Sequence, residues 1–325
     1  MAHLPGTQAP VLATTPATTR PTTRAPGRLG VLAALACCAA LGTGPASATV
    51  MTAEQLNVYR DGSSVDWLLG NDRLLGDGFD NGNPLLGPAF SSTGTAAAYA
   101  LLGLQAGADQ ALAVREQNSQ LLLDPNFGSV SANAQGQTAS SLRLRLLTNT
   151  TTTGAGLNIG QTFASTLRLS LSAAPDPGQT FGLRLNDASI GTTNNDVVEL
   201  FWSGNASGGS IIFRKQDFDA NTVTVLGSAA VVLPANAAML LLSLSHNTVD
   251  SPLISGSYTY ADSSGQLLDS FTAFSNRATA FQGETHTRVE LRATGLSAPV
   301  PEPASWALMA AGLGVLLRRR ARQAG

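Results

Sequence analysis

The chain has few charged residues, a single lysine and only two cysteines. Charged residues make up 12% of its 325 positions, about half the usual share, and Lys215 is the one lysine. Cys37 and Cys38 are adjacent and lie in an apolar stretch near the N-terminus. If export removes that stretch, the remaining chain has no thiol. This excludes a disulfide framework, a cysteine nucleophile and a zinc site with cysteine ligands.

Several enzyme motifs are also missing. The chain has no Gly-x-Ser-x-Gly nucleophile elbow, no P-loop and no dinucleotide fingerprint. His246 and His286 leave a Ser-His-Asp triad open, because serine and aspartate are abundant. We therefore expect a protein that is not an enzyme.

The basic residues gather at the two ends of the chain, and the middle is acidic. Seven of the 19 basic residues lie outside residues 49–299, but only one of the 21 acidic residues, Glu302, does. The middle segment thus has 12 basic and 20 acidic residues, a net charge of −8. Such a segment repels nucleic-acid phosphates, so we expect no nucleic-acid partner.

An apolar segment near the N-terminus has the parts of a secretory signal. Arg28 precedes the apolar run 29–41, glycine and proline then break the helix, and Ala46-Ser47-Ala48 follows. A positive flank, a short apolar helix and small residues at the cleavage site define such signals. We predict that residues 1–48, with an over-long n-region, pass through the Sec translocon and that signal peptidase recognises Ala46 and Ala48.

Two other roles of this segment stay open. A transmembrane anchor needs about 20 apolar residues, and the run 29–41 has 13. A lipoprotein signal needs leucine three residues before its cysteine and a small residue just before it. Three residues before Cys37 stands Ala34 instead of leucine, and just before Cys38 stands Cys37 instead of a small residue. Neither cysteine fits the lipoprotein pattern fully.

The C-terminus has a short motif, an apolar helix and an arginine cluster in that order. Val300-Pro301-Glu302-Pro303 precedes the apolar run 304–317, and Arg318-Arg319-Arg320 follows it. By the positive-inside rule these arginines stay in the cytoplasm. The arrangement resembles the PEP-CTERM sorting signal of Gram-negative bacteria. The resemblance implies that exosortase, a membrane cysteine protease, cuts the tail, and it links the protein to exopolysaccharide and biofilm.

This resemblance also implies a route for the exported protein. The C-terminal helix would hold the chain in the inner membrane transiently, before the protein reaches the cell surface or the medium. The run 304–317 has 14 residues, which is short for a span unless flanking residues contribute. A plain anchor helix is the alternative. We assign residues 299–325 to the sorting signal and residues 49–298 to one domain.

Within that domain, apolar and polar residues alternate from about residue 140 onward. Leu142, Leu144 and Leu146 interleave with Arg143 and Arg145, a period that sends alternate side chains to opposite faces of a sheet. Further strands are expected over 167–172, 181–186, 196–204, 210–217, 222–232, 240–246, 253–261 and 288–292. Polar turns separate them and no convincing soluble helix is present, which predicts an all-β, antiparallel β-sandwich or jelly roll.

The segment 59–130 is less regular and contains a glycine-rich loop at 77–83. Together with 181–185 and 208–213, it resembles the concanavalin A-like lectin/glucanase sandwich. That resemblance implies a domain that binds carbohydrate or acts on it. The Glu-x-Asp-x-x-Glu pattern of glucanases is absent, which argues against hydrolysis.

Oxygen ligands gather in and before the glycine-rich loop, at Asp72, Asp77, Asp80, Asn81 and Asn83. Calcium takes roughly six to eight hard oxygens, and a flexible loop of this kind supplies several. The spacing is not that of an EF-hand, and the alternative is a loop of Asx turns. Calcium at Asp77, Asp80, Asn81 and Asn83 is therefore a hypothesis, and we expect no other cofactor.

Ionisable residues are densest at Glu284, His286, Arg288 and Glu290, which alternate onto one face of an expected strand. Such a group would suit a metal, or a glycosidic bond cut by a carboxylate pair. The alternative is a solvated face of paired charges.

Six arginines are expected to share an outward sheet face. They are Arg143, Arg145, Arg168, Arg184, Arg214 and Arg292. On a concave face they would bind acidic polysaccharide through bidentate contacts; the alternative is that they pair with neighbours and keep the sheet soluble.

Aromatic residues are the other candidate ligand contacts. Trp202 and Tyr258 or Tyr260 would stack on sugar rings, or else pack in the core, and Trp67 is expected in or near the core.

These observations predict an exported surface or matrix protein that binds carbohydrate or acts structurally in exopolysaccharide. The alternative is a polysaccharide-active hydrolase or lyase on the same fold.

Overall fold

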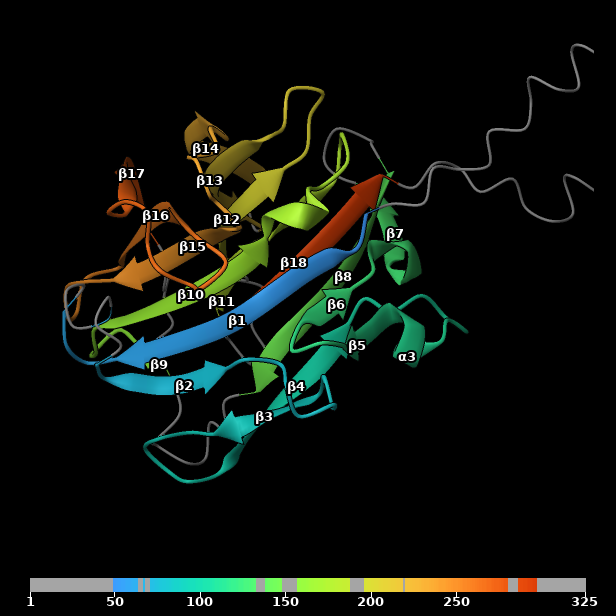
Figure 1. Ribbon diagram of the computed structural model, residues 1–325. Helices are drawn as coiled ribbons and strands as arrows, with labels where there is room; N and C mark the ends of the chain where they lie inside the picture. Colours follow the sequence, from blue (N-terminus) through green and yellow to red (C-terminus); the bar gives the residue numbers. More distant parts are fainter. Residues whose placement is uncertain are drawn as a thin grey trace, which may run out of the picture. The chain divides into compact units, whose positions relative to one another are not determined.

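The computed structural model describes residues 49–63, 67, 71–132, 138–147, 157–187, 196–218, 220–279 and 286–296. All of them belong to one of two compact units, Ser47–Gly325. Two antiparallel sheets pack face to face in this unit (Figure 1). The predicted all-β sandwich is confirmed. The predicted signal and sorting helices lie outside the described residues.

The first sheet, here called sheet A, has eight strands. They are β1 (Met51–Arg60), β2 (Arg73–Asp77), β5 (Val114–Glu116), β6 (Leu121–Leu123), β10 (Phe163–Ser170), β15 (Met239–His246), β16 (Leu253–Ala261) and β17 (Thr272–Thr279). Their spatial order is β17-β16-β15-β10-β1-β6-β5, and β2 pairs with β1.

The second sheet, sheet B, has ten strands. They are β3 (Leu86–Ala89), β4 (Ala96–Leu102), β7 (Ser129–Ala132), β8 (Thr138–Leu147), β9 (Leu157–Asn158), β11 (Thr180–Asp187), β12 (Val197–Ser203), β13 (Ser210–Asp217), β14 (Thr222–Ala230) and β18 (His286–Leu296). Their order is β14-β13-β12-β11-β18-β8-β4-β3, with β7 on β8 and β9 on β18.

Besides Trp67, which has helical conformation, the described residues include three short helical turns. These are α3 (Gln110–Ala113) and the 3-10 turns η1 (Pro125–Phe127) and η2 (Leu171–Ala173). None of these is long and apolar enough to cross a membrane.

The core lies between the two sheets and follows the predicted alternation. Leu142 and Leu144 of β8, Leu183 of β11 and Leu242 of β15 are buried there. Because successive side chains of a strand point to opposite faces, the intervening residues form the outer faces of the sandwich. The expected strand segments correspond to β8, β10–β16 and β18. Strands β1–β7, β9 and β17 were not expected.

Candidate functional site

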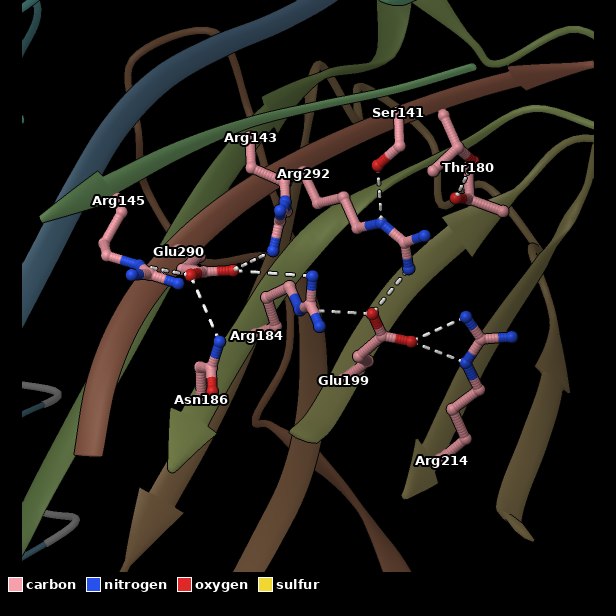
Figure 2. Close-up of polar contacts among 11 residues, drawn as sticks. Ser141, Arg143, Arg145, Thr180, Arg184, Asn186, Glu199, Arg214, Glu290 and Arg292 are labelled. Carbon is pink, nitrogen blue, oxygen red and sulfur yellow. Dashed lines mark hydrogen bonds and ion pairs between the residues drawn. The ribbon is translucent and has the colours of Figure 1, made fainter. Parts of the chain in front are cut away.

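The outer face of sheet B carries a row of charges of alternating sign. Strand pairing sets Arg145 opposite Glu290, and Arg184 between Glu290 and Glu199. Arg214 stands opposite Glu199 on the far side. The row crosses β8, β18, β11, β12 and β13 in that order, so each glutamate has an arginine on either side (Figure 2).

Glu290 is fully buried and lies among three arginines (Figure 2). Arg145 donates from Nε to Oε1 over 2.5 Å. Arg184 and Arg143 place Nη1 atoms 3.4 Å and 3.7 Å from Oε2. Asn186 donates to Oε1 over 3.3 Å. The sequence predicted paired, solvated charges on this face of β18. The charge of Glu290 is paired, as predicted, but its side chain is shielded from water.

Glu199 is also buried and also has three arginine partners (Figure 2). Arg214 approaches Oε2 with Nε and Nη2, both at 2.6 Å. Arg292 donates from Nη1 to Oε1 over 2.6 Å, and Arg184 Nε lies 3.3 Å from the same oxygen. Arg184 thus stands between the two acids and joins them into one network.

The arginines set the protonation states of both acids. Burial raises the pKa of Glu199, but attraction by Arg292, Arg184 and Arg214 outweighs it and holds the pKa well below its usual range. Glu290 follows the same pattern: burial raises its pKa, Arg184, Arg145 and Arg143 lower it, and the net direction is down. Burial lowers the pKa of Arg184 to about 10, so it stays charged at neutral pH. Both acids are therefore carboxylates bound by cations.

Five of the six predicted ligand-binding arginines share this face, and Arg168 does not. Arg143, Arg145, Arg184, Arg214 and Arg292 all have Glu199 or Glu290 as partner. Arg168 lies on β10 in sheet A, so the prediction of one shared face was wrong for that residue. Sequence reasoning did not single out Glu199, although one acid between Val198 and Leu200 in an otherwise apolar strand is a signal for a buried ion pair.

The aromatic candidates lie mainly inside the sandwich. Trp202 is buried in the core, and its Nε1 donates to the carbonyl of Gly208 over 3.2 Å. Tyr260 is buried too, and Tyr258 packs against it edge to face. Stacking of Trp202 on a sugar ring would require the core to open. Trp67 is buried beside Tyr59 and Ala164 in a small separate cluster, near the core as expected.

His246, one of the two histidines that left a Ser-His-Asp triad open, faces the backbone. It is buried, stacks on Phe163 and places Nδ1 and Nε2 each 2.6 Å from a carbonyl oxygen, of Gln161 and Ser251. His286 lies on β18, and Glu284 is outside the described residues.

The predicted calcium loop is held by its own hydrogen bonds. Asp77 accepts from the Phe79 amide and from the Tyr99 hydroxyl, over 2.9 and 2.7 Å. Asn81 and Asn83 each accept an amide two residues ahead, which is the Asx-turn pattern. Asp80 is exposed. No group of three or more potential metal ligands of the His, Cys, Asp or Glu type occurs among the described residues.

A groove of about 880 Å³ lies on the outer face of sheet A. Its floor is formed by β1, β10, β15 and β16, and β17 forms one side. Further lining comes from Gly265, Gln266, Leu267, Ser270 and Phe271. Arg168 faces this groove together with Tyr59 and Trp67. Sequence reasoning missed the groove, because serine and threonine between core leucines are the ordinary pattern of any half-solvated strand.

We predict that Glu199→Gln destabilises the fold by about 3–5 kcal/mol at pH 7, because it leaves three arginines on a buried face without their anion. Since the folded-state pKa is depressed, the stabilisation is present above the ordinary value of 4.5 and is lost as pH falls through the folded pKa. Urea unfolding at pH 7, 5 and 3 should therefore show the gap to wild type narrowing in acid.

Asp80→Asn, which alters an exposed carboxylate outside the network, is the matched control. It should unfold like wild type at each pH. A Glu199→Gln protein as stable as wild type at pH 7 would show that the network contributes no net stability.

We also predict that calcium leaves the melting temperature unchanged, because the loop's oxygens already accept hydrogen bonds from the loop and from Tyr99. Thermal melts in millimolar calcium and in EDTA check this. A rise with calcium that Asp80→Asn abolishes would establish the ion site instead.

Comparison with known proteins identifies the C-terminal tail. Residues 299–321 match the family described as the PEP-CTERM protein-sorting motif. The match contains all the predicted sorting residues, Val300, Pro301, Glu302, Pro303, Arg318, Arg319 and Arg320. No curated protein and no solved structure matches the chain, so the concanavalin A-like resemblance is not confirmed. The chain carries the sorting signal of an exported protein that exosortase recognises in Gram-negative cells.

Proposed function

We propose that the chain is a non-enzymatic protein of the cell surface or extracellular matrix, whose sandwich binds or organises extracellular polysaccharide. The observation that carries this proposal is the sorting motif at 299–321, attached to a β-sandwich with an open polar groove. In the first step of the route the chain passes through the Sec translocon and signal peptidase cleaves it after Ala48. In the second step exosortase cleaves the C-terminal tail.

The charges of sheet B support a role without catalysis. A glycosidase needs one carboxyl group whose raised pKa keeps it protonated as a general acid. Glu199 and Glu290 have lowered pKa values and are surrounded by arginine. The described residues that line the groove of sheet A include no aspartate or glutamate. Neither the Glu199–Glu290 network nor the described lining of the groove thus offers the acid that the hydrolase alternative needs.

The export route is tested by the intact mass of the protein recovered from the medium and from the cell envelope, with and without exosortase. We expect a product that has lost residues 1–48 and the tail when exosortase is present, and a membrane-bound product with its tail when it is absent. A variant with alanine at Pro301, Glu302 and Pro303 should behave in normal cells as the wild type does without exosortase. Full-length, uncut protein in the cytosol would contradict the proposal.

Absence of catalysis is tested separately, by incubating the purified protein with exopolysaccharide from the producing cells. We expect no new reducing ends and no unsaturated sugar products. Either product, formed in proportion to protein concentration, would favour the hydrolase or lyase.

A further inference from the structure

The outer face of sheet A presents polar side chains in a continuous row across four strands. The strand register places Asn57 of β1 beside Thr166 of β10, then Ser243 of β15 and Ser257 of β16. All four residues line the groove. With strands about 4.8 Å apart, the floor of the groove from β1 to β17 is about 19 Å across. The groove therefore offers hydroxyl and amide groups along a line that suits an extended chain rather than a compact molecule.

A second row runs beside the first and ends in an arginine. It passes from Tyr59 through Ala164, Ser245 and Ser255 to Arg277 of β17. Tyr59 and Trp67 form an aromatic corner at the β1 end, where the Tyr59 hydroxyl bonds to Thr166. Aromatic rings line both ends of the groove, Tyr59 and Trp67 at the β1 end and Phe274 at the β17 end, where Arg277 adds a cation.

Two side chains that line the groove have polar atoms without a partner. Asn57 is 5% exposed, and its Oδ1 has no hydrogen bond. The Nε of Arg168, on the neighbouring strand, has none either. Leaving a buried donor or acceptor unpaired costs about 1–3 kcal/mol each. An acceptor and a donor on one wall of an open groove are the sign of a site that a ligand completes.

The groove has positive charge within an acidic domain. Arg168 and Arg277 line it, and the described lining includes no aspartate or glutamate. Residues 49–299 carry a net charge of −8, so an anionic polymer is repelled by most of the domain and attracted here. Gly265, in the loop that follows β16, leaves room for the Arg168 side chain. A Cβ at this position would lie 2.8 Å from Arg168 Nη1. Gly265 also has a φ of +85°, which favours glycine.

We propose that the groove of sheet A binds a segment of acidic polysaccharide, with sugar carboxylates held by Arg168 and Arg277 and sugar hydroxyls by the polar rows. This inference rests on the proposed extracellular role and names the ligand class of that role. Arg143, Arg145, Arg184, Arg214 and Arg292 of sheet B are less suited, because each already has a glutamate partner.

The test is calorimetric titration of the purified full-length chain with alginate oligosaccharides, a polyuronate, and with neutral cello-oligosaccharides of the same length. We expect binding of the polyuronate that weakens as salt rises, and much weaker binding of the neutral chain. Arg168→Gln and Arg277→Gln should each weaken polyuronate binding about tenfold or more, the loss of one charge-assisted contact. Arg277 is exposed on an edge strand, so its variant should fold even if Arg168→Gln does not.

Arg115→Gln is the matched control, because Arg115 lies on β5 of the same sheet and does not line the groove. It should bind like wild type. The inference is overturned if folded wild type binds neither sugar, if the neutral sugar binds equally well, or if Arg277→Gln binds like wild type. It is also overturned if Arg143→Gln in sheet B has the larger effect. None of these results changes the processing seen by intact mass, so the proposed export would stand.

Discussion

The pairing of two buried glutamates with five arginines is the interaction on which sheet B depends. Each acid loses its hydration, and the arginines of the network, with Asn186 at Glu290, compensate for that loss. The arrangement also ties five strands to one register, since a slip of one residue would turn Arg184 and Glu199 toward the core. The acids and arginines of this network on the outer face of sheet B thus form ion pairs with one another.

Sheet A has the opposite character. Its outer face has serine, threonine and asparagine where sheet B has charges, and Arg168 and Arg277 line its groove without an acidic residue beside them in the described lining. Under the proposed function, sheet B gives stability and sheet A gives recognition. The sorting motif accounts for how the sandwich leaves the cytoplasm.

The sequence allowed the strands with strict alternation to be predicted, and the exceptions have physical causes. In β1 an irregularity between Ala53 and Gln55 moves the inward side chains from Met51 and Ala53 to Leu56 and Val58. The alternation of apolar and polar residues is therefore interrupted within β1, and the sequence pattern does not predict the strand. Edge strand β17 is exposed on both faces for most of its length, so it has little apolar alternation to find. Short strands such as β5 and β6 have too few residues to show a period.

The candidate sites were less predictable, because they depend on which strands become neighbours. Arg184 and Arg214 could be placed on an outward face, but their partner Glu199 could not be assigned without the pairing of β12 with β11 and β13. Arg168 has the same Leu-Arg-Leu setting as Arg143 and yet belongs to the other sheet. The sorting motif at 299–321 was predictable, because its signal is local and needs no tertiary contact.

The most direct measurement of the division between the two faces is hydrogen–deuterium exchange with and without a polyuronate oligosaccharide. The account predicts added protection in β10, β15, β16 and the loop around Gly265, with β8, β11, β12 and β18 unchanged. Added protection confined to β8, β11, β12 and β18 would place the ligand on the arginine–glutamate network and contradict the account.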